Sequence, residues 1–199
     1  MSLEMVAVVI TMAAVYLITR QVVWAWPLSM IGVTLYAVVF FEARLYADMG
    51  LQGLYFSLAA YGWWAWLHGG EDHGALRVSR ASTRTGATLL VLATIAGLAL
   101  GFGLSRFTDA SLPYMDSMLT AFSVAAQWMQ TRKLLENWLL WLAVDVFYVS
   151  MFLYMELYLT AGLYGSFLVL AVMGYVQWRR SWRLSVTGPE LAPAGEVAS

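Results

Sequence analysis

The chain has 199 residues, of which 61% are hydrophobic and only 12% are charged. Folding at this length buries about 70% of the surface, which is too little to hide so many apolar side chains from water. This composition excludes a soluble globular enzyme and a disordered chain. The near-equal counts of basic residues (11) and acidic residues (12) exclude a nucleic-acid-binding protein. The class that remains is an all-α protein with several membrane-spanning helices.

Metal and cofactor sites are not expected either. The chain has no Cys, which rules out disulfides and thiolate metal sites. Its two His residues lie close together near the end of one apolar stretch, and they offer too few ligands for a metal ion. No phosphate-binding loop and no nucleophile with a neighbouring base is present. We therefore predict no catalytic residues, no metal and no cofactor.

Seven apolar stretches are long enough to cross a bilayer, which takes about 20 residues. The N-terminus reads Met-Ser-Leu-Glu and lacks the basic region and cleavage site of a signal peptide, so we predict that the first stretch is retained. The predicted spans are roughly 3–19, 22–41, 47–67, 86–105, 113–131, 137–155 and 157–178.

Positive charges divide unevenly between the two sides that seven spans define. Nine fall on one side: Arg20, Arg77, Arg80, Arg84, Arg132, Lys133, Arg179, Arg180 and Arg183. Only Arg44 and Arg106 fall on the other side. Cytoplasmic loops carry the excess of Lys and Arg in membrane proteins. This predicts a periplasmic N-terminus and a cytoplasmic C-terminus.

The chain matches itself when it is shifted by 112 residues. The matched pairs include Trp26 with Trp138, Tyr36 with Tyr148, Phe40 with Phe152, Gly62 with Gly174, and Trp66 with Trp178. We predict two parallel three-helix repeats joined by a linker helix, a 3+1+3 arrangement like that of parallel-repeat transporters, with a site between the halves. Residues 1–68 form the first repeat, 69–112 a cytoplasmic loop and the linker helix, 113–180 the second repeat, and 181–199 a loose cytoplasmic tail.

The predicted linker helix carries Gly97 and Gly101 in a small-xxx-small pattern, which permits close helix approach. These glycines pack either against a neighbouring helix of the same chain or against another protomer.

The sixth span carries the strongest candidate site. Five of its residues share one helical face: Asn137, Trp138, Trp141, Asp145 and Tyr148. Asp145 lies roughly 13 Å along the helix, where an ionisable group is costly and must face the bundle interior or a water-filled cavity. Trp and Tyr rings attract cations, so this face predicts a site for a flat organic cation. The alternatives are interface anchoring for Trp138 and an interhelical hydrogen bond for Asp145.

Further candidates for the same site are polar or aromatic residues on other spans. They are Gln52, Gln127, Tyr164 and Trp26, with Thr120 and Ser123 as weaker ones. Each serves equally well as a partner in an interhelical hydrogen bond or contact.

Three sequence patterns resemble the PnuC-type vitamin transporters over residues 20–182. They are Glu136-Asn-Trp-x-x-Trp141-x-x-x-Asp145, Leu157-Tyr-Leu-Thr-Ala161-x-Leu-Tyr164 followed by Gly174-Tyr-x-x-Trp178, and Phe41-Glu-Ala-x-Leu-Tyr-Ala-Asp48 followed by Tyr61-Gly-Trp-Trp-x-Trp66. In that family the residues at Trp138, Trp141 and Asp145 form the substrate motif.

The resemblance implies a homotrimeric uniporter for nicotinamide riboside in the bacterial inner membrane, with a fold like that of the SWEET sugar transporters. Transport would be facilitated diffusion by alternating access, with cytoplasmic phosphorylation trapping the substrate. Thiamine or another cationic vitamin is the alternative substrate, since relatives carry thiamine or riboflavin. A non-transporting membrane subunit or receptor is the alternative of a different class.

Overall fold

The computed structural model describes residues 3–42, 44, 46–108 and 112–187. Within them the chain forms seven α-helices and one short 3-10 turn, Glu71–His73, as the all-α prediction requires. The helices are α1 (Leu3–Thr19), α2 (Ala25–Glu42), α3 (Tyr46–His68), α4 (Thr83–Phe107), α5 (Pro113–Thr131), α6 (Asn137–Tyr154) and α7 (Tyr158–Thr187). Four of these, α2, α4, α6 and α7, are long and apolar enough to cross a membrane by length and composition.

Helix α7 is longer than the sequence predicted. It has 30 residues and continues to Thr187, past the boundary at residue 180 where we expected a loose tail. Arg179, Arg180 and Arg183 lie in its C-terminal half, and cations near the C-terminus of a helix interact favourably with the helix dipole. The expectation of a tail was therefore wrong for residues 181–187, and residues 188–199 lie outside the described part of the chain.

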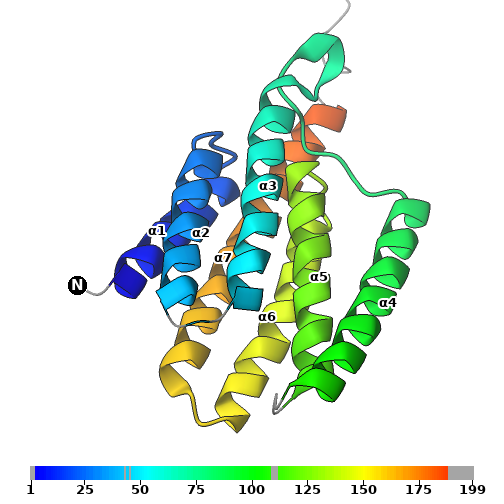
Figure 1. Ribbon diagram of the computed structural model, residues 1–199. Coiled ribbons are helices and arrows are strands. Elements are labelled where there is room, and N and C mark those ends of the chain that lie inside the picture. The colour runs from blue at the N-terminus through cyan, green and yellow to red at the C-terminus, as the bar shows by residue number, and fades with distance from the viewer. Residues whose placement is uncertain (1–2, 43, 45, 109–111, 188–199) are drawn as a thin grey trace, which may run out of the picture.

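The helices form two groups of three and one peripheral helix (Figure 1). Helices α1, α2 and α3 pack in sequence order, as do α5, α6 and α7. The two groups meet where α1 packs against α7 and where α3 packs against α5. Helix α4 packs at the side, mainly on α5.

Two glycines allow α4 to approach α5 closely. A Cβ atom at Gly97 would lie 3.0 Å from the Cα atom of Met118, and one at Gly101 would lie 3.0 Å from the Cα atom of Tyr114. Both distances are shorter than ordinary carbon contacts. The small-xxx-small pattern therefore packs against a neighbouring helix of the same chain, which was one of its two predicted roles.

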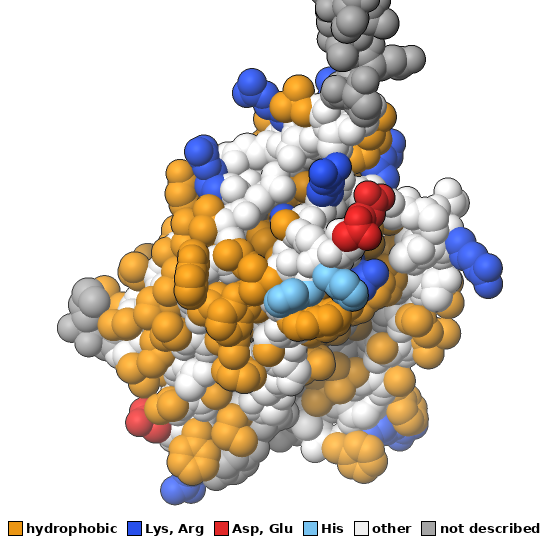
Figure 2. All heavy atoms as spheres, turned by 90° about the horizontal axis from the view of Figure 1, so that it is seen from above, with side chains coloured by type: hydrophobic (Ala, Val, Ile, Leu, Met, Phe, Trp, Pro, Cys, Tyr) orange, Lys and Arg blue, Asp and Glu red, His pale blue; other side chains and the backbone are white. Residues whose placement is uncertain are grey.

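Nine basic residues gather at the end of the bundle where α1 ends and α2 begins, which we call the upper end after its place in Figure 1. Seen from above, separate Lys and Arg side chains surround this end (Figure 2). Arg44 and Arg106 lie at the opposite, lower end. The structure thus sorts the positive charges into the two sets of nine and two that the sequence indicated.

Residues 76–81, which we call the strap, cross the upper end and join α3 to the turn between α5 and α6. The N–H of Leu76 donates to the carbonyl of Trp66 at 3.1 Å, and the Nζ of Lys133 donates to the carbonyl of Leu76 at 2.9 Å. The N–H of Ser79 donates to the carbonyl of Lys133 at 3.1 Å, and the N–H of Leu135 donates to the carbonyl of Ser79 at 2.9 Å.

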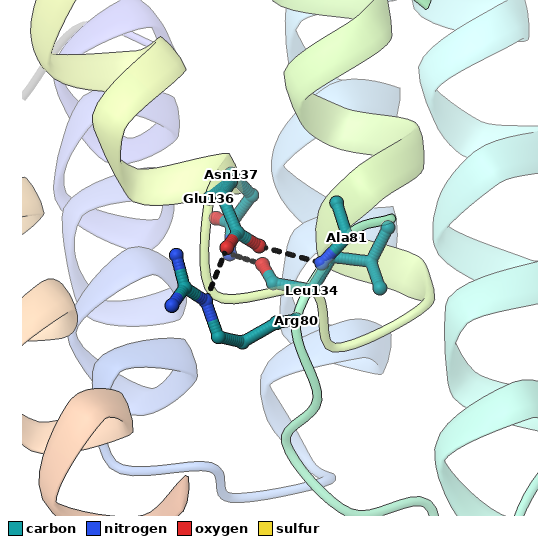
Figure 3. Close-up of polar contacts among 5 residues, drawn as sticks. All are labelled: Arg80, Ala81, Leu134, Glu136 and Asn137. Carbon is teal, nitrogen blue, oxygen red and sulfur yellow. Dashed lines mark hydrogen bonds and ion pairs between the residues drawn. The ribbon is translucent and has the colours of Figure 1, made fainter. Parts of the chain in front are cut away.

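Glu136 fastens the end of the strap through both of its carboxylate oxygens (Figure 3). Oε1 accepts from the Nε of Arg80 at 2.9 Å, and Oε2 accepts from the N–H of Ala81 at 2.8 Å. In the same turn the Nδ2 of Asn137 donates to the carbonyl of Leu134 at 2.6 Å. The strap is therefore held by both backbone and side-chain contacts.

Candidate functional site

Four tryptophans form a buried layer near the upper end, which we call the tryptophan layer. Trp26 meets Trp66 edge-on with 5.3 Å between ring centroids, and Trp138 meets Trp178 edge-on at the same distance. Trp66 and Trp178 join the two pairs at 5.8 Å. Edge-to-face rings at these distances attract one another beyond their burial. The layer is therefore a packed seal at this end of the bundle.

Two hydrogen bonds cross between the helix groups within this layer. The Nε1 of Trp66 donates to the carbonyl of Gln130 at 3.2 Å, and the Nε1 of Trp178 donates to the carbonyl of Ile18 at 3.1 Å. Both carbonyls lie in the last turn of a helix, and each also accepts a backbone N–H, that of Lys133 at Gln130 and that of Gln21 at Ile18. A carbonyl oxygen has two lone pairs, so each tryptophan adds a second hydrogen bond to a carbonyl of the other helix group.

The outer pair of tryptophans depends on glycine. A Cβ atom at Gly62 would overlap the ring of Trp26, and one at Gly174 would overlap the ring of Trp138. Within the described part of the chain, the Nε1 atoms of Trp26 and Trp138 are buried without a hydrogen-bond partner. An unpaired buried donor is costly, so these rings are held by packing alone.

Below this layer, tyrosines from three other helices and Asp145 gather around Tyr164 on α7, and we call this group the tyrosine cluster. Its members are Tyr36 on α2, Tyr55 on α3, Asp145 and Tyr148 on α6, and Tyr164 on α7. The rings of Tyr148 and Tyr164 lie 4.7 Å apart. Tyr164 also lies close enough to Asp145, Tyr55 and Tyr36 to interact electrostatically. The cluster therefore draws on both helix groups.

Helix α5 presents a polar face to the same cluster. Thr120 and Ser123 lie beside the hydroxyl of Tyr148, and Ser123 also lies beside the hydroxyl of Tyr55. Hydroxyls can donate and accept. The cluster can thus both donate hydrogen bonds to a polar solute and accept hydrogen bonds from it.

Asp145 is the buried acid of this cluster, and the exposed Asp116 on α5 also acts electrostatically on Tyr148. The side chain of Asp145 is only 4% exposed, and it lies about 12 Å along α6, halfway through the helix. All eleven Lys and Arg residues lie at the two ends of the bundle, so none shares its depth. A carboxyl group in such a place favours a cation as its partner.

Trp141 lies between the tryptophan layer and the tyrosine cluster. Its Nε1 donates to the Oε1 of Gln130 at 3.2 Å, and its ring stands one helical turn above Asp145. The side chain is only partly buried. This bond fixes the direction of the indole ring, whose face remains suited to stacking.

The nine predicted site residues separate into three sets. Asp145, Tyr148 and Tyr164 come together in the tyrosine cluster, with Trp141 directly above them. Gln52 lies one turn from Tyr55 on α3, and Gln127 lies one turn from Ser123 on α5; both are partly buried. The other three lie at the upper end: Trp26 and Trp138 in the tryptophan layer, and Asn137 beside it.

Two residues of this region were missed in the sequence. Tyr55 left no signal, because its spacing on α3 matches no pattern and its neighbours come from other helices. Gln130 did leave a signal in the sequence, because polar residues repeat at helical spacing along α5: Thr120, Ser123, Gln127 and Gln130.

Comparisons with known proteins settle the family. A family model described as "Nicotinamide mononucleotide transporter" matches residues 1–180. The chain belongs to the nicotinamide mononucleotide transporter family. This confirms the resemblance read from the motifs, and it makes the chain a member of a transporter family rather than an enzyme. The family and the apolar helices fit a multi-pass protein of the bacterial inner membrane.

Relatives with curated names support the same conclusion. The nicotinamide riboside transporter PnuC of Escherichia coli is 25% identical, over 78% of this chain and 75% of its own length. The riboflavin/roseoflavin transporter RibM of Streptomyces davaonensis is 25% identical, over 96% of this chain and 91% of its own length. A crystal structure of the vitamin B3 transporter PnuC has the same fold, with a TM-score of 0.71 at 21% identity, over 91% of this chain and 82% of that one.

Proposed function

We propose that this protein carries nicotinamide riboside across the bacterial inner membrane by facilitated diffusion. The observation that carries the proposal is a buried carboxyl group at mid-depth, Asp145, which lies near Tyr148 and Tyr164. The nicotinamide ring of the riboside is a flat cation, which suits the faces of Trp141, Tyr148 and Tyr164. Its ribose hydroxyls suit the carboxylate and the tyrosine hydroxyls.

The charge of the cluster favours the riboside over the mononucleotide named in the family description. A phosphate group adds about −1.5 to −2 charges at neutral pH. Asp145 would repel this group, and the Lys and Arg residues stand at the ends of the bundle. A substrate without phosphate therefore fits the cluster better.

Thiamine and riboflavin are the alternatives within the family. Thiamine is also a ring cation, so Asp145 suits it in the same way. The isoalloxazine ring of riboflavin is neutral, and it gains stacking but no charge attraction from this cluster. The similarity to RibM is the observation that keeps riboflavin in the comparison.

Binding to the purified protein tests the substrate. We expect nicotinamide riboside to quench tryptophan fluorescence at lower concentrations than thiamine, riboflavin or the mononucleotide, because Trp141 lies beside the cluster. Tighter binding of the mononucleotide would contradict the charge argument.

Uptake into liposomes tests the mechanism. We expect labelled riboside to equilibrate without an imposed gradient, because Asp145 has no chain of buried acids or histidines beside it on its helix to relay protons. In the cell, cytoplasmic phosphorylation would then trap the substrate. Accumulation that requires a proton or sodium gradient would contradict the proposal, and binding without uptake would identify a receptor instead.

We also propose that α1–α3 and α5–α7 are parallel repeats joined by α4, with the N-terminus outside and the C-terminus in the cytoplasm. Contacts that recur 112 residues apart support the repeats: the Trp26–Trp66 and Trp138–Trp178 pairs, and the Tyr36–Phe40 and Tyr148–Phe152 stacks at 6.0 and 5.9 Å. The nine basic residues at the upper end support the orientation. A reporter fused after Arg183 should behave as cytoplasmic, and a periplasmic signal would overturn this topology.

A homotrimer is the assembly we propose, on the family resemblance. Helix α4 supports it, because its outer face exposes Leu92, Ile95 and Phe102 while its glycine face packs on α5. The mass of the protein in detergent, measured by light scattering, should correspond to three chains. A monomer in mild detergent and in native membranes would contradict the assembly.

A further inference from the structure

Trp66 on α3 is the residue at which the first helix group meets both the strap and α5. Its Nε1 donates to the carbonyl of Gln130 at 3.2 Å, and its own carbonyl accepts from the N–H of Leu76 in the strap at 3.1 Å. The Nζ of Lys133, which follows α5, lies 4.3 Å from the centroid of its ring. Separation of α3 from α5 at this end therefore has to release the contacts of this one residue.

Lys133 occupies a backbone position that usually belongs to glycine. The N–H of Lys133 donates to the carbonyl of Gln130 at 3.1 Å. The N–H of the next residue, Leu134, donates to the carbonyl of Met129 at 3.0 Å. Helices that end with this pair of bonds commonly have Gly where Lys133 stands. Lys133 adopts a φ of 49° there, which is unfavourable for a residue with a Cβ atom, so its presence points to a use for its side chain.

The side chain of Lys133 joins Trp66 to the strap. Lys133 is only 7% exposed, and its Nζ donates to the carbonyl of Leu76 at 2.9 Å while it lies over the ring of Trp66. The attraction between an ammonium group and an indole ring is stronger when both are shielded from water. The cation therefore holds the ring in the position from which its Nε1 donates to Gln130.

The strap is bound more firmly to the turn between α5 and α6 than to α3. The backbone of Ser79 makes hydrogen bonds with Lys133 at 3.1 Å and with Leu135 at 2.9 Å. Glu136 binds the end of the strap through both carboxylate oxygens (Figure 3). Within the described residues, the N–H of Leu76 makes the one hydrogen bond from the strap to α3. The joint that parts most easily therefore lies between the strap and α3.

The segment between α3 and the strap, residues 69–75, can absorb such a movement. It contains Gly69, Gly70 and Gly74, and most of its residues are exposed. Glycine changes its backbone conformation at little steric cost, and exposed segments with few packed neighbours open readily. Helix α3 can therefore move away from the strap without pulling the strap from the turn.

We propose that the strap and the α5–α6 turn move as one body, and that Lys133 is a positioning residue that sets how often Trp66 leaves this body and the upper end opens. The proposal rests on the proposed alternating access, with the upper end as the cytoplasmic gate. Its tests record the opening itself. A protein that opened without carrying riboside would contradict the proposed function and leave this proposal standing.

A single introduced cysteine reports the opening, because the chain has no cysteine of its own. Ala126→Cys places a thiol on α5, one turn below Gln130, at a residue that is 0% exposed. An impermeant maleimide added to inside-out vesicles should reach this thiol when the upper end opens. In this background, Lys133→Met should raise the labelling rate by about tenfold or more, because the cation is lost while the apolar part of the side chain is kept.

Two further variants in the same background separate the role of Lys133 from a loss of charge or of packing. Arg77→Met removes a positive charge from an exposed position of the strap and should change the rate by less than about twofold. Lys133→Arg keeps a cation and should stay within about threefold of the unsubstituted rate. An increase in either variant equal to that in Lys133→Met would overturn the role of Lys133. An absence of labelling from this side in all of these proteins would show that the upper end stays closed, which would also overturn the proposal.

Hydrogen exchange in the wild-type protein gives a test that needs no variant. If the strap and the turn move together, each opening takes the acceptor on Trp66 away from the N–H of Leu76, whereas the N–H groups of Ser79 and Leu135 keep their acceptors. After correction for intrinsic rates, we expect the N–H of Leu76 to exchange at least about tenfold faster than the other two. Equal rates, or faster exchange at Ser79 and Leu135, would show that the strap leaves the turn and would overturn the proposal.

Discussion

The two groups of three helices share the residues that close the upper end and differ at the residues that carry polar chemistry. Trp26 and Trp138 occupy matching positions and make matching contacts with Trp66 and Trp178. Asp145, Trp141 and Gln130 instead match Val33, Ser29 and Ile18. Tyr36 and Tyr148 also match, and both belong to the tyrosine cluster. The carboxylate, Trp141 and Gln130 have no polar or aromatic counterpart of the same kind in the first group, so the candidate site is asymmetric at these three positions.

The largest effect on stability should follow from removing a tryptophan of the tryptophan layer, to which both helix groups contribute. Trp138→Ala and Trp26→Ala should each lower the free energy of unfolding by about 3–5 kcal/mol, because each empties a buried site. The two losses should be similar, since the two rings have matching neighbours: Trp26 packs against Trp66 and Gly62, and Trp138 packs against Trp178 and Gly174. Thermal melting in detergent measures them.

An exposed tryptophan provides the control for this pair. Trp24→Ala should change the melting temperature little, because its side chain is 66% exposed. If the Trp138→Ala protein melted like the wild type yet no longer bound substrate, Trp138 would belong to the substrate site. The two helix groups would then differ in the tryptophan layer as well.

The next largest effect should come from the position that distinguishes the groups most. Asp145→Leu should weaken binding of nicotinamide riboside by about 2 kcal/mol or more, because a hydrogen bond to a charged group is lost. The matched substitution Val33→Leu should leave binding nearly unchanged. Fluorescence titration measures the affinity, and thermal melting checks the fold. Normal binding by a folded Asp145→Leu protein would remove the carboxylate from the site.

Asp145→Asn separates charge from hydrogen bonding. If the carboxylate acts through charge, Asp145→Asn should weaken binding of the cationic riboside and leave the binding of a neutral analogue of the same shape unchanged. If the carboxylate acts as an acceptor for ribose hydroxyls, Asp145→Asn should change the affinity for either ligand little, because the amide oxygen of Asn still accepts a hydrogen bond.

A smaller effect should follow at Trp141. Trp141→Phe keeps a ring but loses the hydrogen bond to Gln130, which stabilises by about 1 kcal/mol. Trp141→Ala should weaken binding further, because the stacking surface is lost as well.

Gln130→Leu makes α5 resemble α1, which carries Ile18 at the matching position. Combined with Trp141→Phe in a double-mutant cycle, it should show losses in riboside affinity that are not additive, because both changes remove the same bond. Additive losses would mean that the bond does not orient the ring.

The smallest effect concerns the turns at the upper end. Lys133 and its counterpart Gln21 both adopt positive φ, at 49° and 58°. Burial lowers the pKa of Lys133 from its usual 10.5 to about 8. The unfolded chain then binds more protons than the folded one between pH 8 and 10.5, so stability should rise with pH in this window. The gain between pH 7 and 8.5 should be less than about 1 kcal/mol.

Lys133→Gln makes the second turn resemble the first and should remove this dependence. Melting temperatures of both proteins across this pH range measure it. Identical pH profiles would show that Lys133 titrates alike in the folded and unfolded states.

Sequence patterns predicted the helices well and the partners of single side chains poorly. Seven helices follow from apolar runs separated by charges, because a bilayer demands that periodicity. The end of α7 was misplaced because its last turns leave the apolar run while remaining helical. Hydropathy indicates whether a side chain prefers lipid or water. It does not indicate where the backbone hydrogen bonds of a helix end.

The candidate site shows the same limit. Helical spacing placed Trp138, Trp141 and Asp145 on one face, and they do follow one another along α6. Spacing could not show that Trp138 packs against Trp178 and Gly174, because those contacts come from α7. Tyr55 was missed for the same reason.

The crossed hydrogen bonds of the tryptophan layer have a consequence for kinetics. Trp66 donates from α3 to α5, and Trp178 donates from α7 to α1. Any rotation that parts the two helix groups at this end lengthens both bonds together, since each spans the same boundary. Breaking one alone would strain the other without opening a path. Opening of the upper end should therefore break both bonds, and its rate should have a steep temperature dependence that reflects the enthalpy of both.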